Sequence, residues 1–315
     1  MSKVSGAGAI RRFLIWLDYG CALKWLSRLP AWVAFPLVVV RGALNFAWDA
    51  DWRTHSLGHG YVRAATYKAM LAINRLAGHH GKWRAARLTL GRFIACSIEE
   101  WDVHRLRQMP YDKVKADFSG VDALLAAAQR GQGVVLITAH FDSLYIGLVL
   151  LARKGIKINL MSSKIVNDER VPNCISQHFG EKIGALEQLL DPGCVRHAED
   201  GLGHFVRALK RGEVVLIAGD GPAALEARSA AVHFMGASHL MAPGPEFLAK
   251  STHSLVAAYT CHKRWDQSVH VEVSPLHGLE EAGLQKAYSV LDRHIMRSPW
   301  RWWAADLLPT YSRSS

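Results

Sequence analysis

The sequence predicts an α/β fold, with a mixed, largely parallel sheet flanked by helices and an N-terminal apolar helical segment. Two observations carry this prediction. Residues 134–137 and 214–218 are short, β-branched apolar runs of the kind found in strands buried on both faces. Segments with helical periodicity alternate with such runs along the chain, which is typical of a parallel or mixed sheet covered by helices.

Each element follows from its local pattern. Residues 57–107 have a helical pattern with a basic face, and a polar connection leads to a helix at 120–129. The expected strands lie at 134–137, 156–160, 214–218, 231–235, 255–259 and 270–273. The expected helices begin at Ser143 and occupy 171–179, 201–210, 244–250 and 280–296. We expect a membrane-associating helical segment at 1–55 and an α/β domain at 56–312.

Composition excludes several classes of protein. Half of the 315 residues are hydrophobic and 21% are charged, so the chain is not disordered. The net charge of +11 indicates an anionic partner, which is nucleic acid, an acidic membrane surface, or an acidic substrate or carrier. No basic tract with interleaved aromatic residues predicts a nucleic-acid module, so a membrane or carrier is favoured. Five scattered cysteines fit a reducing compartment, and no motif predicts a metal site.

The first 55 residues are apolar but contain no uninterrupted run of the roughly twenty residues that a spanning helix requires. Charged residues and prolines interrupt the apolar segments. Tryptophan recurs among arginines and lysines, at Trp16, Trp25, Trp32, Trp48 and Trp52. This pattern favours helices that lie in the membrane interface. An amphipathic helical hairpin packed on the domain is the alternative.

His140 lies where the predicted strand at 134–137 gives way to the helix that begins at Ser143. In open α/β sheets, ligands bind at the carboxyl ends of the strands. The unperturbed pKa of an imidazole lies near neutrality, so a histidine at this place is suited to act as a general base. Asp142 either orients this histidine or caps the following helix.

Five motifs follow one another along the chain. They are Gly-Val-Val-Leu-Ile-Thr-Ala-His140-Phe, Ala-Leu-Lys-Arg-Gly-Glu-Val-Val-Leu-Ile-Ala-Gly-Asp220, Val232-His-Phe-Met-Gly236-Ala, Gly244-Pro-Glu-Phe-Leu-Ala-Lys-Ser and Ser298-Pro-Trp-Arg-Trp302-Trp. In this order they resemble the late acyltransferases of lipid A biosynthesis, within the superfamily of lysophospholipid and glycerol-phosphate acyltransferases. The resemblance covers most of the chain and implies a glycerol-phosphate acyltransferase-like fold.

The resemblance implies a catalytic His-x4-Asp/Glu motif, in which the histidine deprotonates an acceptor hydroxyl and the acid holds the imidazole. His140 matches the histidine, but Tyr145 stands where the family has a carboxylate. Three interpretations stay open. Asp142 replaces the missing acid, which is the preferred one; Tyr145 orients His140, with a slower or different reaction; or the site has lost acyl transfer.

Further site residues are implied by the same resemblance. Asp220 matches an aspartate after the later strand, and Gly221 lets the backbone approach a substrate closely. Lys164 stands near the position of a family arginine. Arg170 and Arg228 are candidates for contacts with phosphate groups of the acceptor or of a carrier's phosphopantetheine arm.

These observations predict an acyltransferase on the cytoplasmic face of a bacterial inner membrane. It moves an acyl group from an acyl carrier protein or coenzyme A thioester to a hydroxyl or amine of a membrane lipid, glycolipid or related product. No cofactor or metal is expected. The alternative is a non-catalytic, membrane-associated member of the fold that binds lipid or carrier. A serine hydrolase is disfavoured because Ser143 lacks a Gly-x-Ser-x-Gly motif.

Overall fold

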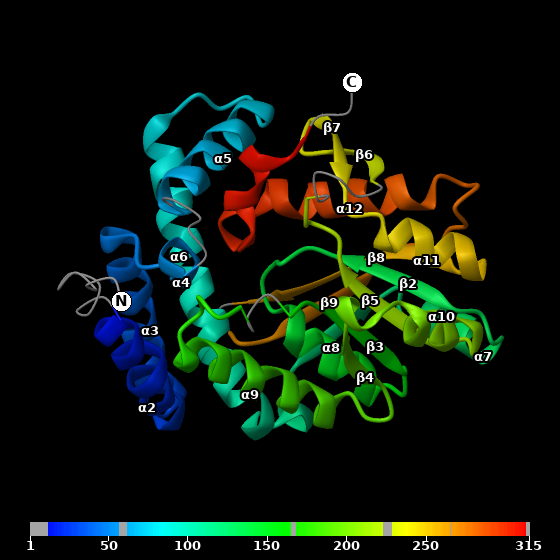
Figure 1. Cartoon of the computed structure of the whole chain (residues 1–315), viewed down its shortest axis with the longest axis horizontal. Coiled ribbons are helices and arrows are strands. Elements are labelled where there is room, and N and C mark those ends of the chain that lie inside the picture. The colour runs from blue at the N-terminus through cyan, green and yellow to red at the C-terminus, as the bar shows by residue number, and fades with distance from the viewer. Residues whose placement is uncertain (1–11, 57–61, 165–167, 223–228, 265, 313–315) are drawn as a thin grey trace.

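The computed structural model describes residues 12–56, 62–164, 168–222, 229–264 and 266–312. The strands of the central sheet are β1 (Ala116–Ser119), β2 (Val134–Thr138), β3 (Ile158–Ser162), β4 (Cys194–His197), β5 (Val214–Ala218), β8 (Leu255–Lys263) and β9 (Val269–Val273). Their order across the sheet is β1-β9-β8-β2-β5-β3-β4 (Figure 1). β8 and β9 are antiparallel, whereas all other neighbours are parallel. The predicted α/β class with a largely parallel sheet is confirmed.

Helices cover both faces of this sheet (Figure 1). One face carries α7 (Val121–Gln129), α8 (Leu144–Arg153) and α9 (Asn173–Leu189). The other carries α10 (Gly203–Lys210), α11 (Gly244–Thr252) and α12 (Gly283–Arg297). A small antiparallel hairpin, β6 (Ala230–Phe234) and β7 (Ala237–Met241), packs against α12. Short 3-10 turns lie at Leu106–Gln108, Tyr111–Lys113, Ala198–Asp200, Pro299–Arg301 and Ala305–Thr310.

The central strand β2 shows why its sequence is apolar without alternation. Val135 and Ile137 enter the core beneath α10, α11 and α12, whereas Val134 and Leu136 enter the core beneath α7, α8 and α9. All four side chains are fully buried. Each such burial contributes about 1.5–3 kcal/mol, so both faces of β2 stabilise the sheet.

The N-terminal part is helical: η1 (Trp16–Ala22, a π-helix), α2 (Leu23–Arg28), α3 (Ala31–Trp48), α4 (Trp52–Ser56), α5 (Val62–Leu76) and α6 (Lys82–Arg105). Figure 1 shows α2 and α3 at one side of the molecule, next to the long helix α6. An apolar N-terminal helix is therefore present, as predicted. Among the described residues, the stretch Ala31–Thr54 is long and apolar enough to cross a membrane by length and composition, which is weak evidence by itself.

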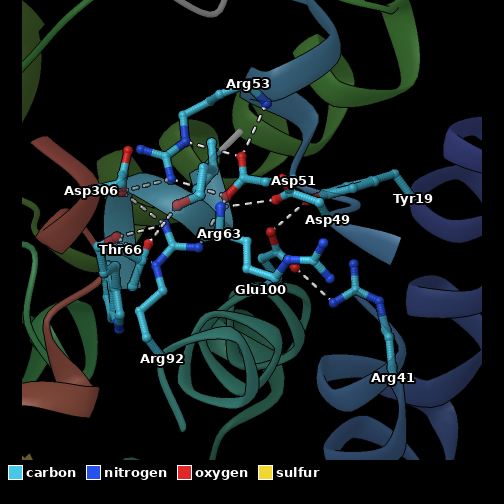
Figure 2. A network of polar contacts seen from close by, with 12 residues as sticks. Tyr19, Arg41, Asp49, Asp51, Arg53, Arg63, Thr66, Arg92, Glu100 and Asp306 are labelled. Carbon is cyan, nitrogen blue, oxygen red and sulfur yellow. Dashed lines mark hydrogen bonds and ion pairs between the residues drawn. The ribbon is translucent and has the colours of Figure 1, made fainter. Parts of the chain in front are cut away.

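A buried polar network joins these helices to the C-terminal segment (Figure 2). Arg92 on α6 is 1% exposed and contacts Asp51 and Asp306 at 3.1 Å each. It also donates to the carbonyl oxygen of Trp303 at 2.9 and 2.6 Å. Arg53 contacts the same two carboxylates at 3.0 and 3.1 Å. Burial raises the pKa of Asp51, but the two guanidinium groups outweigh it and hold this pKa well below its ordinary value.

Some elements differ from the sequence prediction. β1 lies within the expected polar connection, and β4 and β7 were not expected as strands. α9 continues to Leu189, ten residues beyond the predicted helix end at 179. The predicted division of the chain at residues 55 and 56 stays a prediction.

Candidate active site

The sheet register brings His140 and Asp220 together. β2 and β5 pair in parallel, with Thr138 opposite Ala218. The backbone N–H of Gly219 donates to the carbonyl oxygen of Thr138 at 2.7 Å, which extends the ladder beyond the strands. His140 and Asp220 each stand two residues after their strand ends, so they lie beside one another at the carboxyl edge of the sheet, where α/β folds bind ligands.

Asp220 is fully buried, and hydrogen bonds fix both its carboxylate and its backbone. Its Oδ1 lies 2.7 Å from Nδ1 of His140, and its Oδ2 accepts the backbone N–H of the same residue at 2.8 Å. Oδ2 also accepts the indole N–H of Trp302 at 2.8 Å. The hydroxyl of Tyr311 donates to the Asp220 carbonyl oxygen at 2.7 Å. The carboxylate is thereby held in one orientation against the imidazole ring.

This contact sets the protonation of His140. Burial raises the pKa of Asp220, but the charge of His140 and the hydrogen bonds of His140 and Trp302 lower it more, so the carboxylate is ionised at neutral pH. An ionised carboxylate only accepts hydrogen bonds, so Nδ1 carries the proton and Nε2 has the free lone pair. Burial lowers the pKa of His140, but Asp220 raises it above its ordinary value. The imidazole side chain keeps 43% of its surface exposed, so solvent weakens both effects.

The C-terminal segment fixes the loop that carries His140. The backbone N–H of Trp303 donates to the carbonyl oxygen of His140 at 2.7 Å, and the N–H of Asp142 donates to the carbonyl oxygen of Arg301 at 3.0 Å. Phe141 forms an antiparallel bridge with Trp302 between these two bonds. The loop after β2 is therefore paired like a short strand with residues about 160 positions away.

Asp142 contacts other partners. Its backbone has a φ of +47°, in the left-handed region that aspartate tolerates. Its carboxylate forms an ion pair with Arg301 and accepts the backbone N–H of Lys263 at 3.2 Å. In the described part of the chain, the carboxylate that holds the His140 ring is Asp220. The observed geometry thus differs from the sequence-based preference for Asp142 as the orienting acid.

Tyr145 also contacts a group other than His140. Its phenol oxygen accepts a hydrogen bond from Lys182 Nζ at 3.3 Å, and Lys182 lies 3.5 Å from Glu99. Burial raises the pKa of Tyr145, and the nearby ammonium group opposes this effect without cancelling it. Lys182 is itself held protonated, because the charge of Glu99 outweighs the effect of burial and raises the lysine pKa. The Tyr145 hydroxyl therefore stays neutral beside a cation.

Two of the three basic residues expected at the substrate site are paired with acidic neighbours. Lys164 forms an ion pair with Asp200, and its backbone N–H donates to Glu199 at 3.0 Å. Arg170 pairs with Asp168 at 2.7 Å, with 64% of its side chain exposed. Neither residue contacts the His140 ring in the described structure.

Gly221 follows Asp220 directly, and a Cβ atom built at Gly221 would meet no atom within 4 Å. A substrate therefore has room to approach the backbone there. Arg228 lies outside the described residues. Among the residues that the structure describes, no group of three or more His, Cys, Asp or Glu side chains is placed to hold a metal ion.

An apolar cavity of about 590 Å³ lies beside this site. Its walls come from α3, α6, the start of α8 and the segment before β9, and from the C-terminal motif. Among the residues that line the cavity, Asp142, Ser143, Leu144 and Tyr145 follow His140 closely in the chain, and Trp303 is hydrogen-bonded to it. Leu144 lines this cavity, whereas Leu148, Phe234, Met235 and Met241 are buried in the two cores of the sheet.

Several site residues were not expected from the sequence. Trp302 was part of a quoted motif, but the sequence could not show that its indole reaches a strand end 82 residues away. Lys182 and Glu99 come from two helices that no local pattern connects. The sequence alone does not show that Arg92, in an amphipathic helix, is buried. Its burial becomes clear only from the positions of its acidic partners in the structure.

An open α/β sheet with a carboxylate-held histidine at its carboxyl edge, next to an apolar cavity, is suited to group transfer involving an apolar substrate. A sequence model of the family described as "Bacterial lipid A biosynthesis acyltransferase" matches residues 92–303. The chain therefore belongs to the lipid A biosynthesis acyltransferase family, as its motifs indicated. The comparison with curated proteins found no match.

Proposed function

We propose that this acyltransferase moves an acyl group from an acyl-carrier thioester to a hydroxyl or amine of a membrane lipid or glycolipid, with His140 as general base. The observation that carries the proposal is the contact of 2.7 Å between His140 Nδ1 and the buried carboxylate of Asp220. It leaves Nε2 free to accept the proton of the acceptor. In the family motif, a carboxylate at the position of Tyr145 orients the histidine. In this proposal Asp220 has that role instead.

The reaction follows from this arrangement. The acceptor oxygen or nitrogen loses its proton to Nε2 as it attacks the thioester carbonyl carbon, and the imidazolium that forms is stabilised by Asp220. The tetrahedral intermediate collapses with cleavage of the carbon–sulfur bond. His140 then returns the proton to the leaving thiolate. The reaction is balanced without a cofactor or metal ion.

The cavity beside the site suits the acyl chain of the donor. Its lining is largely apolar and includes Leu144 and Ile146 of α8 together with Ile94 and Ile98 of α6. The net charge of +11 suits an acidic acyl carrier protein as the donor. We infer from the family and the exposed apolar helices that the reaction takes place at the bacterial inner membrane, on its cytoplasmic face.

Replacement of His140 tests the proposal. The purified chain is incubated with extracted inner-membrane lipids and one of two donors, acyl carrier protein or coenzyme A, each charged with a radiolabelled acyl group. The radioactivity transferred to lipid is then counted. We expect His140→Ala to lower transfer by at least about a hundredfold, because removal of a general base typically costs a factor of 10²–10⁴. The faster of the two donors identifies the carrier.

The matched control is His80→Ala, since His80 is exposed in the turn between α5 and α6. This variant is expected to retain full activity. Circular dichroism and thermal unfolding verify that the His140→Ala chain is folded. A folded His140→Ala protein with native transfer rates would end the proposal.

A further inference from the structure

The exposed face of the N-terminal helices is apolar. The solvent-exposed residues of α3, a helix that is described throughout, are all apolar: Ala31, Trp32, Pro36, Leu37, Val40, Leu44, Ala47 and Trp48. Trp32 is 81% exposed and Trp48 is 71% exposed. The preceding helices add Phe13, Leu14, Trp16, Leu17 and Trp25 to this surface. We call these exposed residues of the segment 13–48 the docking face. An apolar patch of this extent marks an interaction site.

The opposite face of α3 is buried against α6, where Ala34 and Val38 join an apolar cluster and Arg41 is the buried charged residue. Arg41 binds both carboxylate oxygens of Asp18 at 2.6 Å and contacts Glu100 of α6 at 2.6 Å (Figure 2). At Gly42 the two helices approach so closely that a Cβ atom would lie 2.6 Å from the Cα of Ile94. α3 is therefore fixed along α6, as Figure 1 also shows.

This packing disfavours a membrane-spanning α3. To cross the bilayer, α3 would have to carry Arg41, Asp18 and Glu100 into the hydrocarbon region or separate from α6 and leave these charges unpaired. Both alternatives are costly for a membrane helix. α6 cannot accompany α3, because its exposed N-terminal end carries Lys82 and Arg84 and its middle holds the buried network of Arg92. A helix with one apolar face and one face packed on protein is instead suited to lie on the bilayer surface.

We propose that the protein is monotopic: the docking face lies in one leaflet of an anionic phospholipid membrane, and no part of the segment 13–48 crosses it. Charge complementarity supports a lipid partner, because Arg12 and Arg28 are exposed on the same N-terminal helices and the net charge is +11. Five tryptophans occur in the first 52 residues, and tryptophan prefers the headgroup level of a bilayer.

The docking face is continuous with the cavity beside the candidate active site. Pro36 and Val40 are exposed on the docking face and also line the cavity, next to Phe35 and Val39. A hydrocarbon chain therefore passes between the leaflet and the cavity along α3 without crossing bulk water. This consequence rests on the proposed function, whereas the membrane geometry does not.

Vesicle binding tests the lipid partner. The full chain is sedimented with vesicles of phosphatidylethanolamine and phosphatidylglycerol, and with pure phosphatidylcholine vesicles. We expect stronger binding to the anionic vesicles, and at least about a tenfold loss of binding in the double variant Trp32→Ser/Trp48→Ser, since two buried aromatic side chains are removed. Phe247→Ser is the matched control, because Phe247 is an exposed aromatic residue on α11, away from the docking face.

Unchanged binding of the double variant would overturn the proposal. A chain that is dimeric in lipid-free buffer and becomes monomeric in the double variant would assign the face to a second copy, and would also overturn it. These experiments measure membrane binding and not acyl transfer. Their outcome is therefore independent of the His140→Ala experiment, which tests the proposed function.

Topology is tested with single cysteines at the two ends of α3. Ala31→Cys and Ala47→Cys are placed in a chain whose five native cysteines are replaced by alanine, and inner-membrane vesicles of both orientations are treated with an impermeant maleimide. Labelling of both sites from the same side is expected, and labelling from opposite sides would refute the monotopic arrangement. If the cysteine-free chain does not fold, the depth of Trp32 and Trp48 is measured instead with brominated lipids, as the quenching that the native chain shows and the Trp32→Ser/Trp48→Ser variant loses. Quenching by shallow bromines supports the proposal, and quenching by bromines at the bilayer centre contradicts it.

Discussion

The indole N–H of Trp302 donates to the same carboxylate of Asp220 that holds the ring of His140, at 2.8 Å. Both partners are fully buried, so this bond has no competition from water. A tryptophan near the end of the chain thus fixes an aspartate that follows a central strand, and the aspartate fixes the histidine of the neighbouring strand.

The first prediction separates the two candidate acids. Asp220→Asn removes the charge that stabilises an imidazolium on His140, so we expect kcat to fall by at least about a hundredfold. Asp142→Asn removes the partner of Arg301 and is expected to lower the free energy of unfolding by about 1–3 kcal/mol while kcat changes less than about fivefold. Transfer assays and urea unfolding of both variants measure these effects. The reverse ranking of the two kcat values would restore Asp142 as the orienting acid.

The second prediction concerns Trp302. Trp302→Phe keeps most of the ring volume but removes a hydrogen bond to a buried charge, so the free energy of unfolding should fall by about 1.5–3 kcal/mol and kcat by about tenfold. Trp101→Phe is the matched control, because its indole is equally buried and donates to the neutral carbonyl oxygen of Leu26 at 3.1 Å. That control should lose stability but retain kcat. Equal losses of kcat in the two variants would show that Trp302 acts only as a packing residue.

The third prediction is a pH dependence. A general base must be unprotonated, and Asp220 raises the pKa of His140 above its ordinary value of 6.5 although burial acts in the opposite direction. Activity should therefore rise with pH with a midpoint above 6.5. In Asp220→Asn only the lowering effects of burial and of nearby cations remain, so the midpoint of the residual activity should move downward. A rate profile of kcat/KM against pH measures both midpoints, and an upward movement in the variant would contradict the assignment.

The fourth prediction concerns the tyrosine at the position of the family carboxylate. Tyr145→Phe removes a contact with Lys182 and none with His140. We expect kcat to change less than about threefold, because a hydrogen bond of 3.3 Å contributes little. Single-turnover transfer assays measure the change. A loss of more than a hundredfold would instead support Tyr145 as the group that orients the base.

The fifth prediction tests the buried network of Arg92. Arg92→Met leaves Asp51 and Asp306 with one cation fewer in a buried place, so the free energy of unfolding should fall by about 3–5 kcal/mol. Arg153→Met breaks an exposed ion pair with Asp112 and should cost less than about 1 kcal/mol. Chemical denaturation of both variants gives the comparison. Similar losses would mean that the network contributes no more than a surface ion pair.

The sequence predicted the sheet well because its central strands are buried on both faces. The runs at 134–137 and 214–218 match β2 and β5 to within one residue, and the helix expected from Ser143 begins at Leu144. β1 and β4 were not predicted because they are four-residue edge strands with exposed positions, and such strands lack a run of apolar residues. The predicted helix at 171–179 is shorter than α9, since the later turns of α9 mix polar and apolar residues.

The candidate site was only half predictable. His140 and Asp220 were both identified from motifs, but their contact depends on the pairing of β2 with β5, which no local pattern encodes. Asp142 was preferred as the acid because it is near in sequence. The direction of the Asp142 carboxylate is determined by the left-handed backbone of this residue and by the ion pair with Arg301. Neither can be predicted from the spacing of residues along the sequence.

The bonds from Trp302, Trp303 and Tyr311 to the histidine loop and to Asp220 have a consequence for shortened forms of the chain. In the proposed mechanism, a form that stops before residue 302 is expected to lose acyl transfer, because neither the carboxylate that orients His140 nor the loop that carries His140 is held in place.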